Sequence, residues 1–443
     1  MTSKAHATAA DDASTRGPIW SGAIDLVVPD VPETLPAPQV GGTFVAARVL
    51  VRVSGEPIGF VDVPVRENRI DVAEVERVVR ARHPRRLAEE LARHASAESE
   101  ASAEAAGPSV AGDAAELART IAICTRDRPE SLSRALRGVI EADPGAAAII
   151  VVDSASTSDV TRRVVDDFAA TDPRVLYVRE DRPGVSRARN AALRAAETEV
   201  IAYIDDDVIV DRKWMDALGR GFARAGNVGC VTGLIASASL ELPTEQYFDG
   251  RVSWSSTCEP RTYVYERGPR DSRLHPYTPG SIGAGANAAF RTRALREIGG
   301  FDERLGPGTP TLAGEDLDVF VRIMRAGWAI AFEPAALVWH AHRVDEASLR
   351  SQLYGYGAGL SAYLTKHVCS RAGVRPVLGR LLVGLVHGMR LGASTRDAQS
   401  DSGLAPAVAL VELRGLVAGP WLFAKAVYED RLSSRRGSAP GRR

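Results

Sequence analysis

Residues 147–180 read AAIIVVDSASTSDVTRRVVDDFAATDPRVLYVRE, and this stretch decides the fold. It begins with an apolar run that does not alternate with polar residues, continues with apolar residues at helical spacing, and ends with a second apolar run. Such runs are typical of strands covered on both faces, and strands that alternate with helices form parallel sheets. The stretch therefore predicts a strand, a helix and a second strand parallel to the first.

The same alternation continues on both sides of this stretch. Residues 120–125 predict a strand and residues 129–142 a helix before it, while residues 184–197 predict a helix and residues 200–207 a strand after it. The predicted fold class is therefore α/β, with a doubly wound and mostly parallel sheet. In such sheets ligands bind at the carboxyl ends of the strands, so the polar residues that directly follow each strand are candidate site residues.

The composition is that of an ordinary globular protein. The 443 residues are 45% hydrophobic and 25% charged, and the formal net charge of -1 gives no positive field that would hold nucleic acid. The four cysteines are far apart and form no CxxC pair, which disfavours a zinc site or a disulfide framework. Since the first residues also have no apolar core of a signal peptide, we expect a cytoplasmic protein that does not bind nucleic acid.

Shifts in composition divide the chain into parts. Alternation around a turn with Gly and Pro predicts a small β-containing module, and the Ala-, Ser- and Glu-rich residues after it have too few apolar side chains to form a core. The predicted parts are a disordered lead-in (1–40), a small β/α N-terminal module (41–95), a linker (96–118), the main α/β domain (119–345), a C-terminal helical region (346–430) and a basic tail (431–443).

Two apolar stretches, residues 374–391 and 404–428, lie in the C-terminal region, and charged residues interrupt both. Neither has about 20 consecutive apolar residues, so we do not expect a membrane-spanning helix. One alternative is that these helices pack on the core or on the partner subunit of a homo-oligomer. The other is that they lie on a membrane as interfacial helices, with the arginines of the tail near anionic lipid.

Three consecutive carboxylates, Asp205, Asp206 and Asp207, end the last predicted strand. Side chains alternate in direction along an extended chain, so Asp205 and Asp207 can face one way while Asp206 faces the other. Two converging carboxylates suit Mg²⁺ or Mn²⁺, whose charge would offset their repulsion. The alternative is an acidic turn that caps the next helix, but Asp211 is better placed as that N-cap.

Six segments occur in a recognisable order: AICTRDRPESLSRAL, VVDSAST, GVSRARNAAL, IDDD, GAGANAAFRTRALREIGGFDERL and GEDLDVFVRIMRAGW. Together they resemble the inverting glycosyltransferases of family 2, which have the nucleotide-sugar-binding GT-A fold. The resemblance extends from Thr120 to Arg343, roughly half of the chain. It implies a GT-A-type sheet in the main domain and a nucleotide-sugar donor at its carboxyl edge.

The resemblance implies roles for residues on the donor side of the site. Thr125 and Arg126 would border the base and ribose, and Asp153 would accept hydrogen bonds from the base. Arg189 and Asn190 would lie near the sugar-diphosphate or the ribose. The residues themselves agree in part, since a loop that leads into a helix N-terminus favours anionic groups. Without the resemblance, Arg189 could belong to a solvated helix face and Asp153 to a turn.

Within the acidic triplet, the resemblance implies that Asp207 is a metal ligand. Asp205 would be a partner of the metal or of the ribose. Asp206 would be a neighbour of the sugar or of Arg189. The expected cofactor is Mn²⁺ or Mg²⁺.

The resemblance also places functional residues in the second half of the main domain. His340, at a predicted strand end, would complete the metal shell with His342 as its nearest rival, although a lone histidine is more often structural. Asp316 would be the general base, with the adjacent Glu315 as the alternative. Local sequence alone is also consistent with two acids that simply favour the positive end of a helix dipole. A carboxylate is a weak base unless burial raises its pKa.

The expected activity is the transfer of a sugar from a nucleotide-diphospho-sugar, with a UDP-sugar favoured, to the hydroxyl of a glycan, a lipid-linked acceptor or a small molecule. The displacement would invert the anomeric carbon. A non-catalytic nucleotide-sugar-binding or scaffold protein is the alternative, but it would have no use for the base Asp316. A nucleotidyltransferase is disfavoured because the loop CTRDRPES has no glycine. The enzyme would be cytoplasmic, and peripheral contact with the inner face of the plasma membrane stays open.

Overall fold

The computed structural model describes residues 17–27, 34–36, 43–104, 117–143, 145–252, 258–266, 275–277, 280, 282–370 and 405–437. The chain divides into two compact units. The first consists of Met1–Ala106 with Ala238–Gln246, and the second of Gly107–Ser237 with Tyr247–Arg443.

The first unit is built on a small sheet with the order β1-β3-β4, in which β1 is parallel and β4 antiparallel to β3. Ser54 and Gly55 have positive φ and close the hairpin between β3 and β4, as two-residue hairpin turns require. Val49 and Val51 are fully buried in the core that this sheet forms with the helices. The elements are β1 (Ile19–Asp25), β2 (Thr34–Pro36), β3 (Ala46–Val53), β4 (Glu56–Pro64), β5 (Arg69–Asp71), α1 (Val72–Arg82) and α2 (Pro84–Glu104), and β2 pairs with β5.

Two predictions for this part of the chain are wrong. The disordered lead-in predicted over residues 1–40 contains β1, because Trp20 and Ile24 pack into the core of the small sheet. The predicted linker starts too early at residue 96, because α2 continues to Glu104. Its Ala and Glu residues favour a helix even where there is no core to cover.

The second unit contains a nine-stranded sheet with the order β10-β14-β11-β13-β9-β6-β7-β8, and β12 pairs with β14. Six strands, β6, β7, β8, β9, β11 and β14, run in one direction, and β10, β12 and β13 run in the other. The prediction of a mostly parallel sheet is therefore confirmed. The strands are β6 (Arg119–Thr125), β7 (Ala148–Ser154), β8 (Val175–Glu180), β9 (Val200–Asp205), β10 (Val208–Val210), β11 (Val228–Ser237), β12 (Arg261–Tyr263), β13 (Asn287–Arg291) and β14 (Ala329–His340).

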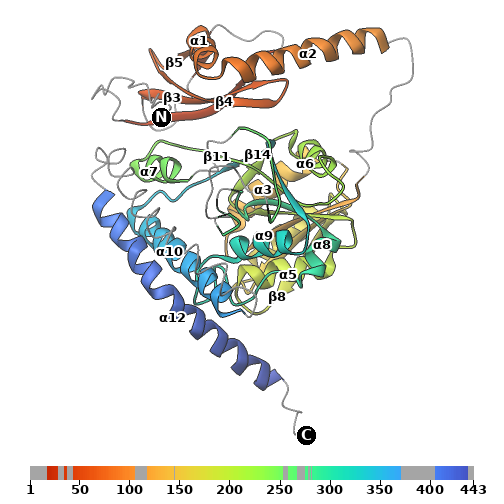
Figure 1. Ribbon diagram of the computed structural model, residues 1–443, viewed down its shortest axis with the longest axis vertical. Helices are drawn as coiled ribbons and strands as arrows, with labels where there is room; N and C mark the ends of the chain where they lie inside the picture. Colours follow the sequence, from red (N-terminus) through yellow and green to blue (C-terminus); the bar gives the residue numbers. More distant parts are fainter. Residues whose placement is uncertain are drawn as a thin grey trace. The chain divides into compact units, whose positions relative to one another are not determined.

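Helices cover both faces of the large sheet, which confirms the doubly wound arrangement (Figure 1). On one face, Leu136 and Trp214 are fully buried in a core with strand residues such as Ile123 and Val151. The helices on this face are α3 (Pro129–Ala142), α4 (Val160–Ala169) and α6 (Trp214–Ala223). Those on the other face are α5 (Val185–Ala195), α8 (Thr292–Glu297) and α9 (Glu315–Arg325).

Two long helices, α10 (Glu346–Cys369) and α12 (Ala405–Gly437), lie side by side at the C-terminal end of the chain (Figure 1). They approach closely because a Cβ on Gly357 or Gly415 would collide with a backbone carbonyl of the other helix. Among the residues that the structure describes, no helix combines the length and the apolar character needed to cross a membrane. The first of the two apolar stretches, residues 374–391, lies outside the described residues, and α12 extends into the predicted basic tail.

Candidate active site

Three neighbouring strands end at the same edge of the large sheet. Asp153 in β7 lies opposite Thr125 in β6, and Cys124 in β6 lies opposite Asp205 in β9. Adjacent strands are about 5 Å apart, so the ends of β7 and β9 are separated by about 10 Å. The edge predicted to bind a ligand therefore carries acidic side chains on both sides of β6.

Asp205, Asp207 and His340 form a group that could hold a metal ion. One ligand atom from each residue lies within 4.8 Å of those of the other two. Asp207 comes directly before β10, and β10 pairs with β14 so that Val208 lies opposite His340. Two carboxylates and an imidazole suit Mn²⁺, and the carboxylates also suit Mg²⁺. The structure thus brings together the predicted metal ligands, and His340 rather than its rival belongs to the group.

Asp207 is stabilised as a charged carboxylate. Its Oδ1 lies 3.3 Å from Nε2 of His340, and its Oδ2 accepts a hydrogen bond from Nη1 of Arg128 at 3.0 Å. Burial disfavours the charge, but these two neighbours outweigh it and lower the pKa of Asp207. Burial likewise opposes protonation of His340, while Asp207 raises the pKa of this histidine. The group therefore carries negative charge where a cation would bind.

Asp206 faces away from this group, toward the loop after β6. Its Oδ2 accepts a hydrogen bond from Oγ1 of Thr125 at 2.6 Å, and its Oδ1 accepts one from Nη1 of Arg128 at 3.1 Å. Burial raises the pKa of Asp206 to about 6. Asp206 therefore pairs with Thr125, whereas Arg189 pairs with Asp205, and the expected position of Asp206 beside the sugar stays a prediction. Arg126 is half-exposed, and its location at the base and ribose of the donor stays a prediction.

Sequence reasoning missed Arg128, which binds both Asp206 and Asp207. It lies three residues after β6, in the loop CTRDRPES. The signal that could have found Arg128 was a cation in the loop after β6, next to the strand β9 that leads into the acidic triplet. Arg126 in the same loop made this signal ambiguous.

Arg189 connects the two acidic parts of the site. Its buried guanidinium donates to Oδ1 of Asp205 at 3.2 Å, to Oε1 of Glu315 at 3.0 Å and to the carbonyl of Gly285 at 3.3 Å. Gly285 leaves room for it, since a Cβ there would lie 2.8 Å from the guanidinium. Carboxylates and a carbonyl thus surround the cation, and its predicted place near the sugar-diphosphate or the ribose stays a prediction.

Asn190, the next residue of α5, does not face this group. Its Nδ2 donates to the carbonyl of Phe301 at 2.9 Å, and its Oδ1 accepts from the backbone N–H of Phe301 at 2.8 Å. Both ends of the amide thus hold the loop after α8. These contacts give Asn190 a structural role, and its predicted place near the donor stays a prediction.

Glu315 and Asp316 form an acidic pair in the first turn of α9. Burial raises the pKa of Glu315 to about 7, with a further contribution from Asp316, while Arg189 opposes the shift. Asp316 is half-buried; its Oδ2 accepts from the N–H of Gly285 at 3.2 Å and its Oδ1 from that of Leu317 at 2.8 Å. Burial also raises the pKa of Asp316, against Arg189 and these N–H groups. Asp316 is the more exposed of the two and is not paired with Arg189, so it is better placed as a base.

Asp153 is covered by other side chains. Its Oδ1 accepts from the N–H of Ser156 at 3.0 Å, and its Oδ2 accepts from the hydroxyl of Tyr177 at 2.8 Å and from Nη1 of Arg179 at 2.9 Å. Burial opposes ionisation, but these donors lower the pKa of Asp153. The carboxylate of Asp153 is fully buried beneath these partners, and its contact with a nucleotide base stays a prediction.

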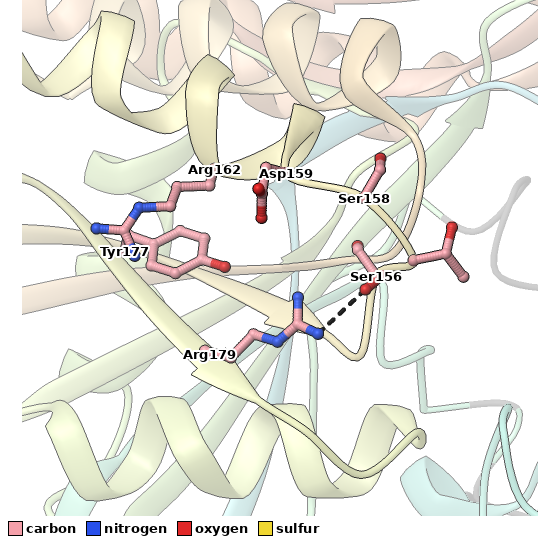
Figure 2. Close-up of a pocket in the computed structure, with 7 residues that line it drawn as sticks. Ser156, Ser158, Asp159, Arg162, Tyr177 and Arg179 are labelled. Carbon is pink, nitrogen blue, oxygen red and sulfur yellow. Dashed lines mark hydrogen bonds between the residues drawn. The ribbon is translucent and has the colours of Figure 1, made fainter.

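The residues that cover Asp153 line a pocket of about 360 Å³ (Figure 2). Arg179 donates to the carbonyl of Ser156 at 3.1 Å, and the guanidinium of Arg162 lies 4.9 Å from the ring centroid of Tyr177. The pocket thus offers an aromatic ring, two cations and several hydroxyls at the edge where β7 ends. Its lining consists of Ser156, Thr157, Ser158, Asp159, Arg162, Tyr177 and Arg179.

The large sheet is doubly wound, and its carboxyl edge carries the group that could hold a metal ion and a second acidic pair. This is the architecture of the GT-A glycosyltransferases. Residues 120–299 match glycosyl transferase family 2. Over these residues, fewer than half of the chain, the protein is similar to that family of glycosyltransferases.

Three known proteins illustrate the similarity. The chain is 28% identical over 253 residues to the pre-mycofactocin glycosyltransferase of Mycobacterium tuberculosis, covering 56% of this chain and 48% of the relative. It is 28% identical over 298 residues to the succinoglycan biosynthesis protein ExoM of Rhizobium meliloti, covering 66% of this chain and 84% of the relative. The solved mannosyltransferase PcManGT of Pyrobaculum calidifontis, in complex with GDP-Man and Mn²⁺, aligns with a TM-score of 0.45 and 20% identity over 74% of this chain and 92% of the other. The chain thus spans about half the length of the mycobacterial relative.

Proposed function

We propose that the protein is a metal-dependent inverting glycosyltransferase that moves a sugar from a nucleotide-diphospho-sugar to a hydroxyl acceptor. The observation that carries this proposal is the bridge that Arg189 makes between Asp205 and Glu315. It supports one site with two halves, a metal group and an acidic pair. A protein that only bound nucleotide-sugars would have no use for the second half, which disfavours the non-catalytic alternative.

In the proposed mechanism Asp205, Asp207 and His340 would hold the metal ion, Mn²⁺ or Mg²⁺. When bound, the ion would supply the positive charge that offsets the charges of the diphosphate and of the leaving group. Asp316 accepts the proton of the acceptor hydroxyl while the hydroxyl oxygen attacks the anomeric carbon. The bond to the nucleoside diphosphate breaks on the opposite side of that carbon, so the configuration inverts.

The nucleoside of the donor lies toward the pocket of Figure 2 in this proposal. The pocket lies at the ends of β7 and β8, and the metal group lies at the end of β9, about 10 Å from the end of β7. A nucleoside diphosphate can cover such a span. Tyr177 offers a ring for stacking, and Arg179 offers donors for a base carbonyl. We keep the expectation of a UDP-sugar, and the acceptor is a hydroxyl of a glycan, a lipid-linked molecule or a small molecule.

A screen of UDP-, GDP- and dTDP-sugars with and without Mn²⁺ tests the proposal. We expect one nucleotide class to bind, and Mn²⁺ to strengthen its binding. Asp316→Asn should retain donor binding and lose transfer. The proposal fails if no donor binds in a metal-dependent way, whereas metal-dependent binding without transfer or hydrolysis by the unmodified protein would favour the non-catalytic alternative.

We also propose that α12 lies on the inner face of the plasma membrane, as a peripheral contact of a cytoplasmic enzyme. Five large apolar side chains, which we call the apolar stripe, are exposed at helical spacing along it: Leu410, Leu413, Val417, Trp421 and Tyr428. Arg414, Lys425 and Arg431 are exposed within or beside the angular range of the stripe, whereas Glu412 lies on the opposite side of the helix and pairs with Arg251. An apolar face with flanking cations suits an anionic lipid surface.

A further inference from the structure

Nδ1 of His340 is the first atom of a hydrogen-bonded series of buried polar side chains. Its Nδ1 lies 3.2 Å from Nδ1 of His342, and Nε2 of His342 lies 2.7 Å from Oγ of Ser237. Ser237 in turn donates a hydrogen bond to Oδ1 of Asp249. His342, Ser237 and Asp249 are each less than 10% exposed. We call these three residues the support chain.

Distant segments bring the support chain together. Ser237 ends β11 and lies opposite His340 in the register of β11 with β14. Asp249 comes from α7 (Pro243–Arg251), and the ring of Phe248 lies 4.6 Å from that of His342. The support chain is therefore held by a sheet, a helix and an aromatic contact, and its members have little freedom to reorient.

The acceptor at the end of the support chain sets the direction of every hydrogen bond in it. Ser237 has a single hydroxyl proton, which it donates to Oδ1 of Asp249. The oxygen of Ser237 must then accept from Nε2–H of His342. A neutral His342 has no proton left on Nδ1, so this atom accepts from Nδ1–H of His340. Its Nε2 is the atom of His340 that remains for the metal group, 3.3 Å from Asp207.

We propose that Ser237, His342 and Asp249 are positioning residues that keep a proton on Nδ1 of His340 and so present Nε2 of His340 as a metal ligand. The proposal rests on the metal site of the proposed function and adds the residues that orient one of its ligands. Outer partners of this kind typically contribute 10- to 100-fold to metal affinity. Nothing in the proposal requires these residues to touch the donor or the acceptor.

Mn²⁺ affinity of the full chain, measured by isothermal titration calorimetry and by electron paramagnetic resonance, tests the proposal. We expect Ser237→Ala and His342→Leu to weaken Mn²⁺ binding about 10- to 100-fold. His342→Gln should retain most of the affinity, because an amide can accept from His340 and donate to Ser237 in the same direction. Thr232→Val is the matched control, since Thr232 is also buried on β11 but its hydroxyl donates to the carbonyl of Ile282.

Thermal unfolding of the metal-free variants separates positioning from a purely structural role. If Ser237→Ala and His342→Leu lower the melting temperature but bind Mn²⁺ as tightly as the unmodified protein, the support chain does not position the ligand. If they weaken Mn²⁺ binding and Thr232→Val does not, the proposal holds.

Nitrogen-15 NMR of the histidine rings gives a readout that does not depend on the metal. The support chain predicts that His342 carries its proton on Nε2 in the metal-free protein, and that Ser237→Ala changes the chemical shift of this nitrogen. A proton on Nδ1 of His342 would overturn the support chain even if Mn²⁺ binds. Conversely, the predicted tautomer in a protein that does not bind Mn²⁺ would place the failure in the proposed function.

Discussion

Arg189 is a buried cation between the carboxylates of Asp205 and Glu315. Removing one partner of a buried ion pair leaves an uncompensated charge, which typically costs 3–5 kcal/mol. We therefore expect Arg189→Met to lower the free energy of unfolding by about 3–5 kcal/mol in urea denaturation. Arg194→Met is the matched control on the same helix, because Arg194 is exposed and its pair with Glu180 is worth at most about 1 kcal/mol. Equal, small effects of both substitutions would contradict the bridging role.

Asp316 gives the site a predictable response to pH. Burial raises the pKa of Asp316, and a general base works only when it is deprotonated. At saturating Mn²⁺ we therefore expect kcat/KM to fall as the pH is lowered through this raised pKa, with the inflection above the ordinary carboxyl value of about 4. An inflection at or below that value would show that another group acts as the base.

The raised pKa of Asp316 also makes the stability of the protein depend on pH, in the direction opposite to that of kcat/KM. Because the pKa of Asp316 is higher in the folded than in the unfolded state, the folded protein binds more protons between the two values, and stability falls as the pH rises through that window. Asp316→Asn removes the buried charge. We expect this variant to be inactive in transfer but more stable than the unmodified protein at neutral pH, as measured by thermal unfolding at pH 5 and pH 8. Loss of stability at pH 8 would indicate that the Asp316 carboxylate is favourable in the fold.

How far the site could be predicted depends on where the partners of each residue lie in the chain. Asp207 lies just after β9 and His340 ends β14, and it was the family resemblance that implied a shared metal site for the two residues. The burial of Asp153 was not, because it depends on Tyr177, which comes from another strand. Arg189 shows the same limit: its helix was predicted, but its carboxylate partners come from two other elements.

At the scale of elements, α9 depends on glycines at both of its ends. Gly314 has a φ of 97° before the first turn, and a Cβ there would lie 2.6 Å from the carbonyl oxygen of Gly359 in α10. Gly327 has a φ of 90° after the last turn, and no atom lies within 4 Å of a Cβ placed there. Both glycines have the backbone strain of a positive φ, but only Gly314 has a neighbouring helix where a Cβ would lie.

We therefore expect Gly327→Ala to destabilise the protein by about 1–2 kcal/mol and to leave transfer nearly unchanged. Gly314→Ala should destabilise it further, because α9 must move away from α10, and should reduce kcat because Glu315 and Asp316 move with the helix. Urea denaturation and steady-state kinetics of both variants measure the difference. If the two variants behave alike, the contact with Gly359 does not position the acidic pair.

The elements also show why local pattern predicts one half of the sheet better than the other. β6, β7, β8 and β9 each contain an apolar run of four or more residues between helices, and such runs are hard to mistake. β13 lies antiparallel between β9 and β11, and no local pattern shows that a strand from residues 287–291 is inserted there. β1 was missed because Ser21 and Gly22 interrupt the apolar residues of IWSGAID, and the strand is stabilised by its pairing with β3.

At the scale of the whole molecule, the proposed membrane contact rests on the charge and the apolar character of α12. Val417 and Trp421 are 77% and 66% exposed, which is unusual for large apolar side chains next to each other on one helix face. If the apolar stripe enters a lipid surface, these side chains leave water, whereas flanking cations such as Lys425 and Arg431 remain near the headgroups. The alternative is that the apolar stripe contacts another copy of the chain, as in the homo-oligomer expected from the apolar C-terminal region.

Flotation of the full chain with vesicles decides between these occupants. We expect binding to vesicles that contain phosphatidylglycerol, weaker binding to pure phosphatidylcholine, and weakening by salt because exposed charges are screened. The double substitution Val417→Ser and Trp421→Ser should lower the bound fraction about tenfold or more, since each buried large apolar side chain contributes roughly 1.5–3 kcal/mol. Leu176→Ser is the control, because Leu176 is 46% exposed on β8, away from the stripe. A protein that stays unbound with all vesicles, and whose dimer in light scattering is lost in the double variant, would assign the apolar stripe to a second copy of the chain.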